Sequence, residues 1–150
     1  MPAQSGTPHH QKNIQKLEMV QRRAARFVTK MPHRSTDGQY ASVSARIQDM
    51  GWKSLQERRK NNRLVMMYRI VHNLVEIPPS HHPTPREYQP ARGNQNQFTP
   101  LQPEVEAYKY AFLPRTIVDW NQLDLATVSS ESLDTFKRHL YKKQQQTNKR

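Results

Sequence analysis

The sequence predicts a mainly α-helical protein: a small helical domain of about four to five helices, a Pro-rich irregular linker, and at most a short extended segment near residues 108–112. Two long stretches without glycine or proline, residues 13–30 and 54–77, repeat apolar residues at helical spacing. Seven of the 11 prolines fall between Pro78 and Pro103, where they interrupt regular structure. The alternation typical of a strand is limited to one short aromatic segment.

The composition narrows the classes of function. Only 34% of the 150 residues are hydrophobic, against roughly 45–50% in ordinary globular domains, which disfavours a large enclosed active-site scaffold. Lysine and arginine total 24 against 12 acidic residues, so the formal net charge is +12. A charge of this sign and size favours polyanionic partners such as RNA or DNA.

The absence of cysteine excludes disulfides, thiolate nucleophiles and cysteine-ligated metals. The first residues, MPAQSGTPHH, are polar and lack the apolar core of a signal peptide. No uncharged apolar run approaches the roughly 20 residues that span a bilayer. We therefore expect an intracellular protein, cytoplasmic or nuclear, that is not secreted and has no membrane partner.

Proline content and charge divide the chain into five parts. We expect a disordered N-terminal segment at 1–12, a basic helical region at 13–77, a Pro-rich linker at 78–106, an aromatic and helical C-terminal region at 107–141, and a basic tail at 142–150.

The first predicted helix is amphipathic. Asn13 is a suitable N-cap, and Met31 before Pro32 ends the helix because a residue preceding proline is pushed out of the α region. The apolar side consists of Ile14, Leu17, Val20, Ala24, Phe27, Val28 and Met31. The cationic side, roughly opposite, consists of Lys12, Lys16, Arg22, Arg23, Arg26 and Lys30.

A short second helix is indicated by Val43, Ile47 and Met50, with Gly51 at the position of a left-handed C-cap. Ser54 and Glu57 then have the spacing of a capping box, which predicts the start of a long helix. The apolar side of that helix consists of Leu64, Met67, Tyr68, Val71, Leu74 and Val75, and the sequence Ile77-Pro78-Pro79 ends it. We expect this side to pack against Ile14, Leu17, Val20 and Phe27 of the first helix.

The C-terminal region begins with an extended pattern in which Tyr108, Tyr110 and Phe112 alternate with Lys109 and Ala111. Pro114 suits the first turn of a helix that carries Ile117, Val118 and Trp120. We interpret Trp120 and Phe112 as a small core rather than as base-stacking platforms, because the local charge is negative. Asp119 and Asn121 are then turn or capping residues.

The last predicted helix is opened by Ser129 or Ser130 and carries Leu133, Phe136 and Leu140 along one side. A polar basic tail, YKKQQQTNKR, follows it.

Patterns that carry catalysis are not found in the sequence. The 12 acids are scattered rather than clustered as a polymerase or nuclease needs for its metal ions, and no G-x-x-x-x-G-K-[ST] phosphate loop occurs. The paired histidines, His9 with His10 and His81 with His82, are interpreted as surface residues rather than metal ligands. We therefore expect no catalytic residue, no metal, no cofactor and no small-molecule substrate.

Basic residues occur in three runs. Residues 11–30 carry six basic residues and one acid, residues 53–63 carry five and one, and residues 137–150 carry six and none, whereas residues 104–136 carry six acids. A solvated helix surface explains each run separately. Together they indicate either a surface that follows phosphates or charge matching within the fold.

Four blocks of sequence resemble the C-terminal end of LINE-type non-LTR retrotransposon polyproteins of the jockey-like or chicken-repeat-like kind. The blocks are IQKLEMVQRRAARFV (14–28), MGWKSLQERRKNNRLVMMYRIVHNLVEIP (50–78), YKYAFLPRTIVDWNQL (108–123) and SLDTFKRHL (132–140). The resemblance covers about residues 8 to 140. It implies the outer edge of a reverse transcriptase thumb and the region after the polymerase, in a chain that lacks the family's catalytic Tyr/Phe-x-Asp-Asp motif.

Two functional hypotheses follow. In the first, the chain is a non-catalytic remnant of a reverse transcriptase C-terminal region that binds RNA or DNA through phosphate contacts, with no sequence preference. The candidate residues are Arg22, Arg23, Arg26, Arg58, Arg59, Arg63 and Arg115. In the second, it is a structural module whose apolar helix faces need the missing polymerase for packing, with no independent function.

Overall fold

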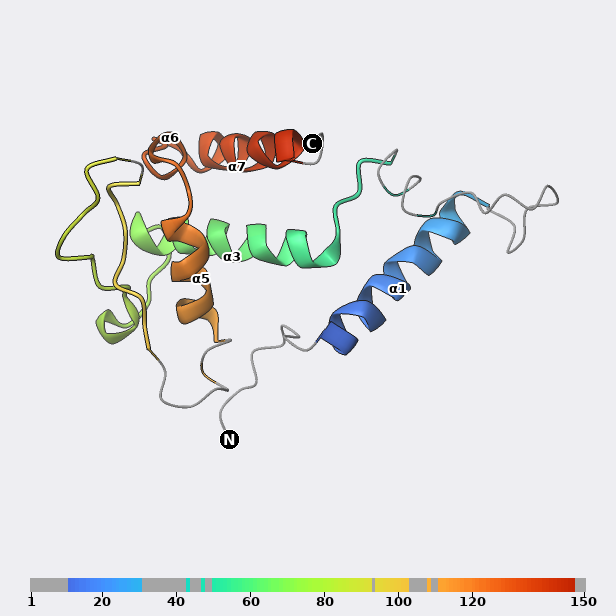
Figure 1. Ribbon diagram of the computed structural model, residues 1–150, viewed down its shortest axis with the longest axis horizontal. Coiled ribbons are helices and arrows are strands. Elements are labelled where there is room, and N and C mark those ends of the chain that lie inside the picture. The colour runs from blue at the N-terminus through green and yellow to red at the C-terminus, as the bar shows by residue number, and fades with distance from the viewer. Residues whose placement is uncertain are drawn as a thin grey trace. The chain divides into compact units, whose positions relative to one another are not determined.

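The computed structural model confirms a mainly helical fold (Figure 1). It describes residues 11–30, 43, 47, 50–92, 94–102, 108 and 111–147, with side chains as far as residue 142. The helices in these ranges are α1 (Gln11–Val28), α3 (Leu55–Val71), the 3-10 helix η1 (Pro79–His81), α5 (Phe112–Asn121), α6 (Leu125–Val128) and α7 (Leu133–Thr147). Within the same ranges, β pairing is limited to one isolated bridge between Pro85 and Phe98.

The chain divides into two compact units at the junction of Arg59 and Lys60, inside α3. We call the part before this junction the N-terminal unit and the part after it the C-terminal unit. The N-terminal unit contains α1 and the first turn of α3, and the C-terminal unit contains the rest of α3 and all later helices. No described helix is both long enough and apolar enough to cross a bilayer.

α1 begins and ends differently from the prediction. It starts at Gln11, so Asn13 lies inside the helix rather than at its N-cap; glutamine and lysine are good helix formers and extend it. Its last residue is Val28, and Lys30 follows in the left-handed conformation with φ of 50°. The amide of Lys30 donates to the carbonyl of Phe27 at 3.2 Å, which closes the last turn. Met31 and Pro32 lie outside the described residues.

The prediction of which side of α1 is buried was wrong in part: Ile14 is buried and Leu17 half-buried, as predicted, but other members of the apolar side are exposed. Val20, Phe27 and Val28 are 59%, 86% and 60% exposed. The residues that the helix buries are Ile14, Gln21 and Ala25. The buried side is therefore rotated away from the apolar stripe, because polar contacts to another segment orient the helix.

Those polar contacts join α1 to the start of α3 within the N-terminal unit. The Nε2 atom of Gln21 donates to the carbonyl oxygen of Lys53 at 2.8 Å. The Oε1 atom of Glu18 accepts from the amide of Gln56 at 3.1 Å. Glu18 thus supplies a carboxylate to the N-terminal turn of α3, where free amides and the helix dipole favour negative charge.

The two predicted caps before α3 are present. Gly51 has φ of +66°, and the amide of Trp52 donates to the carbonyl of Ile47 at 2.9 Å, as in a Schellman C-cap. The hydroxyl of Ser54 accepts from the amide of Glu57 at 3.1 Å, which confirms Ser54 as the N-cap. The Glu57 carboxylate lies 3.8 Å from Lys53 Nζ.

α3 ends earlier than predicted. The helix stops at Val71, and Asn73 adopts the left-handed conformation with φ of 53°. The amide of Leu74 donates to the carbonyl of Arg69 at 2.8 Å, and that of Asn73 to the carbonyl of Ile70 at 3.1 Å. This is a Schellman motif with asparagine in place of glycine. Leu74 is consequently 58% exposed instead of lying on the buried stripe.

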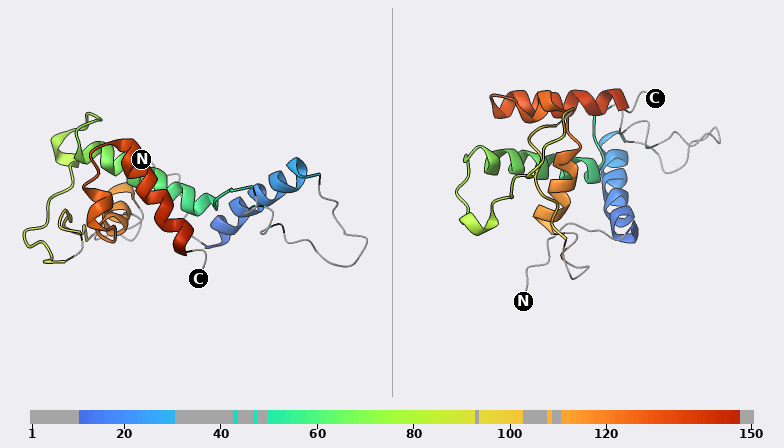
Figure 2. Two further views of the ribbon diagram at one scale, coloured as in Figure 1. Left: turned by 90° about the horizontal axis from the view of Figure 1, so that it is seen from above. Right: turned by 60° about the vertical axis from the view of Figure 1, so that its left-hand side comes forward.

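The core of the C-terminal unit lies where α3, α5 and α7 meet, with α5 crossing α3 (Figures 1 and 2). The predicted apolar stripes of α3 and α7 supply most of it. Its buried members are Leu64, Met67, Tyr68, Phe98, Ile117, Trp120, Val128, Phe136 and Leu140. The rings of Trp120 and Phe136 stack with centroids 5.8 Å apart.

α5 and α7 also differ in detail from the prediction. Tyr108 is helical and Phe112 is the first residue of α5, so these ends of the expected extended segment are not extended. Pro114 does lie in the first turn of α5. The N-cap of α7 is Ser132, whose hydroxyl accepts from the amide of Thr135 at 3.2 Å, rather than Ser129 or Ser130. α7 continues to Thr147, so much of the expected tail is helical.

The Pro-rich segment is irregular, as expected, yet its described residues are well bonded. The amide of Arg86 donates to the carbonyl of Gln97 at 2.9 Å, and the amide of Thr99 to that of Thr84 at 2.8 Å. The segment also contributes the buried Phe98 to the core. Long-range contacts therefore hold the loop, even though its composition resembles that of a linker.

Candidate nucleic-acid interface

The strongest candidate surface is the cationic side of α1. Arg22, Arg23 and Arg26 are all exposed, and no described acidic side chain pairs with them. Arg22 and Arg26 are one turn apart, and Arg23 lies on the adjacent row of the same helix surface. Helical periodicity thus gathers three guanidinium groups, each able to bind phosphate oxygens through two N–H donors.

The charge of this surface is not offset by α1 itself. Glu18 is the one acidic residue between residues 11 and 30, and its carboxylate is used at the N-terminal turn of α3. The hydrogen bonds of Glu18 and Gln21 also determine which side of α1 faces solvent. This role of Glu18 and Gln21 was not predicted from the sequence, since their partners lie more than thirty residues away.

The arginines of α3 fall into different environments. Arg58 is exposed and Arg59 is half-buried, both in the N-terminal unit. Arg63 is in the C-terminal unit, and its side chain is only 10% exposed. Its Nη2 atom donates to Asp119 Oδ2 at 2.9 Å. Arg63 therefore faces a carboxylate inside the fold, and we leave it out of the proposed interface.

Arg115 is half-buried on α5 and makes an interaction of its own. The seven candidate arginines thus fall into three groups. Arg22, Arg23 and Arg26 share one exposed helix side, Arg58 and Arg59 begin another helix of the same unit, and Arg63 and Arg115 belong to the C-terminal unit.

Trp120 is a core residue, as expected from the sequence. It is fully buried, and its indole Nε1 donates to the carbonyl of Asn96 at 3.0 Å. The neighbouring polar residues have more specific roles than turn or cap. Asp119 also accepts from Lys60 Nζ at 2.9 Å, and Asn121 pairs with both backbone groups of Phe98 at 3.0 and 2.8 Å.

A serine and a histidine lie close together at the α6–α7 junction, but their contacts indicate a structural role rather than a catalytic pair. Ser130 Oγ lies 3.3 Å from His139 Nδ1 and donates to the carbonyl of Thr127 at 2.8 Å. His139 Nδ1 lies 3.2 Å from the carbonyl of Ala126. A proton on Nδ1 satisfies that carbonyl, and the nitrogen then has no lone pair with which to activate the buried Ser130 hydroxyl.

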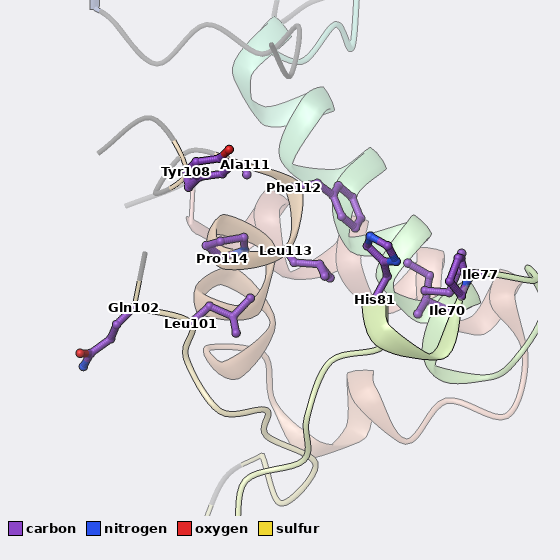
Figure 3. A pocket seen from close by; sticks show the side chains of 11 residues that line it. Ile70, Ile77, His81, Leu101, Gln102, Tyr108, Ala111, Phe112, Leu113 and Pro114 are labelled. Carbon is purple, nitrogen blue, oxygen red and sulfur yellow. The ribbon is translucent and has the colours of Figure 1, made fainter. Parts of the chain in front are cut away.

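An apolar pocket of about 690 Å³ opens in the C-terminal unit (Figure 3). His81 and Ile70 line one side, and Leu101 and Pro114 the other. The Gln102 side chain points away from the pocket. Most residues that line the pocket are apolar, and His81, Gln102 and Tyr108 are the polar ones. This lining suits contact with apolar groups rather than catalysis.

Metal-ligating side chains do not gather in the part of the chain that the structure describes, where no group of three His, Asp or Glu side chains could hold an ion. The histidine pair His9 and His10 lies outside those residues.

The comparisons with known proteins do not assign this chain to a family. No family model, curated protein or solved structure matches this chain. We therefore infer the function from the chemistry of the chain's own surfaces, and above all from the exposed positive charge on the cationic side of α1.

Proposed function

We propose that this chain is a non-catalytic part of a retrotransposon reverse transcriptase C-terminal region that binds the backbone of RNA or DNA without sequence preference. The observation that carries the proposal is the exposure of Arg22, Arg23 and Arg26 on one helix side while Glu18 is turned to α3. Such a side attracts phosphates and releases their counterions on binding. Phosphate contacts of this kind position the nucleic acid and carry no base information, so no sequence preference is expected.

The test is the salt dependence of binding. Affinity of the purified chain for several unrelated single-stranded RNAs should be similar and should fall steeply as salt rises. Replacing Arg22, Arg23 and Arg26 together by alanine should reduce the log-log slope by about two, since each single-strand phosphate contact contributes about 0.7. Far-UV circular dichroism of the triple variant checks that α1 remains helical.

A matched control removes the same charge elsewhere. Arg92, Arg138 and Lys142 are exposed cations of the C-terminal unit. Their triple alanine variant has the same net charge as the α1 variant and should keep the slope of the unmodified chain. An equal loss of slope in both variants would mean that binding follows net charge alone, against a role for α1.

The second candidate is a structural module that packs on a polymerase. The exposed apolar side of α1, with Val20, Phe27 and Val28 more than half exposed, favours it. Under this proposal the chain shows no salt-dependent affinity for nucleic acid, and α1 gains helicity or stability only with a protein partner. The same binding experiment therefore separates the two candidates.

A further inference from the structure

Phe27 is unusual among the large apolar residues of the described chain because 86% of its surface is exposed. The other described phenylalanines, Phe98, Phe112 and Phe136, are buried or half-buried. Exposing an aromatic ring to water forgoes the favourable free energy of burying it. The ring is therefore available for an external partner.

The position of Phe27 on α1 indicates what kind of partner. Arg23 is four residues earlier and lies one turn away on the same row of the helix surface. Lys30 follows the helix end, and its amide donates to the carbonyl of Phe27 at 3.2 Å. The exposed ring thus has one cation four residues before it and another three residues after it along the chain.

Phe27 also lies at the border between the two sides of α1. At about 100° per residue, the apolar stripe centres near Leu17 and Ala24, and Phe27 is at its edge next to the cationic side. A helix that lies on a membrane surface buries its apolar side in the lipid interface, whereas α1 already packs part of that side within the protein, with Ile14 buried and Leu17 half-buried. An aromatic ring beside cations is instead the arrangement by which proteins hold single-stranded nucleic acid.

We infer that Arg23, Phe27 and Lys30 form a stacking site for single-stranded nucleic acid, in which the Phe27 ring packs on an unpaired base and the two cations contact the flanking phosphates. This inference depends on the proposed function, because it adds a base contact to the same helix side. In a duplex the base faces are already stacked on each other, and exposing one requires unpairing and unstacking it. The site therefore selects single strands over duplexes without reading their sequence.

The first experiment compares variants at position 27 on a single-stranded oligonucleotide and on a hairpin duplex of the same composition. Phe27→Leu keeps an apolar side chain and removes the ring, whereas Phe27→Tyr keeps the ring. We expect Phe27→Leu to weaken single-strand binding about tenfold, with an unchanged salt slope and unchanged duplex affinity. Phe27→Tyr should bind like the unmodified chain.

Val20→Ala is the matched control, because Val20 is 59% exposed on the apolar side of the same helix. It should leave both affinities unchanged. Equal binding of the Phe27→Leu variant and the unmodified chain to single strands would overturn the stacking site. If the salt-dependent binding that depends on Arg22, Arg23 and Arg26 remained, the proposed function would still hold, and only the stacking site would be lost.

A spectroscopic measurement reports the ring contact directly. Phe27→Trp combined with Trp52→Phe places one exposed tryptophan on α1 and leaves the buried Trp120 as an internal reference. We expect unrelated single-stranded oligonucleotides to quench the exposed emission and the duplex to leave it unchanged. With no quenching by oligonucleotide, an emission shift to shorter wavelength on adding anionic phosphatidylserine vesicles, or on raising protein concentration alone, would assign Phe27 to a membrane surface or a second copy and overturn the inference.

Discussion

Arg63 and Asp119 form a part-buried ion pair, with Nη2 and Oδ2 2.9 Å apart, between α3 and α5. The Arg63 side chain is 10% exposed and that of Asp119 is 17% exposed. Lys60 adds a second contact to the same carboxylate at 2.9 Å. One acid therefore pairs with two cations where the two helices meet. The positive charge of Arg63 thus has a structural role within the fold and need not indicate nucleic-acid binding.

The first prediction concerns the removal of that acid. Asp119→Asn should lower the free energy of unfolding by about 2–4 kcal/mol, because Arg63 would remain largely buried without its counter-charge. Two of the Arg63 nitrogens, Nε and Nη1, are already buried without a hydrogen-bond partner in the described structure. Urea unfolding followed by circular dichroism measures the change.

Asp134→Asn is the control for that measurement. Asp134 pairs with Lys137 at 3.8 Å, but its side chain is 89% exposed. An exposed pair contributes little, so this variant should change stability by less than about 0.5 kcal/mol. Similar losses of unfolding free energy in the two variants would show that burying the Arg63–Asp119 pair does not increase its contribution to stability.

The second prediction concerns the C-cap of α3. Asn73 has φ of 53° and follows the helix end. Asn73→Gly should stabilise the protein slightly, whereas Asn73→Ala should destabilise it by about 1 kcal/mol, since a Cβ without a compensating polar group disfavours the left-handed region. Thermal melting of the two variants beside the unmodified chain tests the order Gly, Asn, Ala. A more stable alanine variant would contradict the left-handed cap.

Local signals account for the parts of the fold that were predicted from the sequence. Gly51 and Ser54 act within a few residues of themselves, so their cap roles were accessible from spacing alone. The buried positions of α3 and α7, such as Leu64 and Phe136, follow helical periodicity. Asn73 is a case where the local signal was present and overlooked, because asparagine is common at left-handed C-caps.

Long-range contacts account for the errors. The orientation of α1 depends on Gln21 and Glu18 reaching residues 32 and 38 positions away, and periodicity cannot detect such contacts. Arg63 could not be distinguished from the other arginines, because its partner Asp119 is 56 positions away. The exposure of Arg22, Arg23 and Arg26, by contrast, followed from the cationic side of an amphipathic helix.

The third prediction is a pH dependence centred on Tyr68. Its hydroxyl is buried and donates to the carbonyl of Ser130 at 2.7 Å. Burial raises the pKa of Tyr68 above its ordinary value of 10.0. In alkaline solution the unfolded chain therefore loses this proton first. The contribution of the protonated Tyr68 hydroxyl to the free energy of unfolding is therefore complete below about pH 10. It is lost as the pH rises through the higher pKa of Tyr68 in the folded state.

Tyr68→Phe tests this dependence. The variant should lose about 1 kcal/mol at neutral pH, through the hydrogen bond to Ser130. It should also show a shallower decline in unfolding free energy above pH 10 than the unmodified chain, because one fewer proton is released on unfolding. Urea midpoints at pH 8, 10 and 11 give both values. Parallel declines in the two proteins would exclude Tyr68 as the source.

The fourth prediction concerns the contact between the Pro-rich segment and α5. Asn121 uses its side chain as a strand would use its backbone: Oδ1 accepts from the Phe98 amide at 3.0 Å and Nδ2 donates to the Phe98 carbonyl at 2.8 Å. Asn121→Asp keeps the acceptor but places a carboxylate oxygen against that carbonyl. We expect a loss of about 1–3 kcal/mol, the cost of an unsatisfied and repelled polar group.

In the Asn121→Asp variant, the segment around Phe98 should loosen before the whole protein unfolds. Phe98 is 8% exposed and its ring centroid lies 6.1 Å from that of Trp120, which is fully buried. When the Phe98 segment loosens, Trp120 gains contact with water, so its emission should shift to longer wavelength and the Phe98 amide should exchange faster. Gln95→Glu makes the same amide-to-carboxylate change at an exposed position of the same segment and should alter neither signal. Identical exchange rates for Phe98 in Asn121→Asp and the unmodified chain would mean that the Asn121 side chain does not hold the loop. Its other bonds would then suffice, such as those from Asn94 to the Trp120 carbonyl and from Trp120 to the Asn96 carbonyl, both at 3.0 Å.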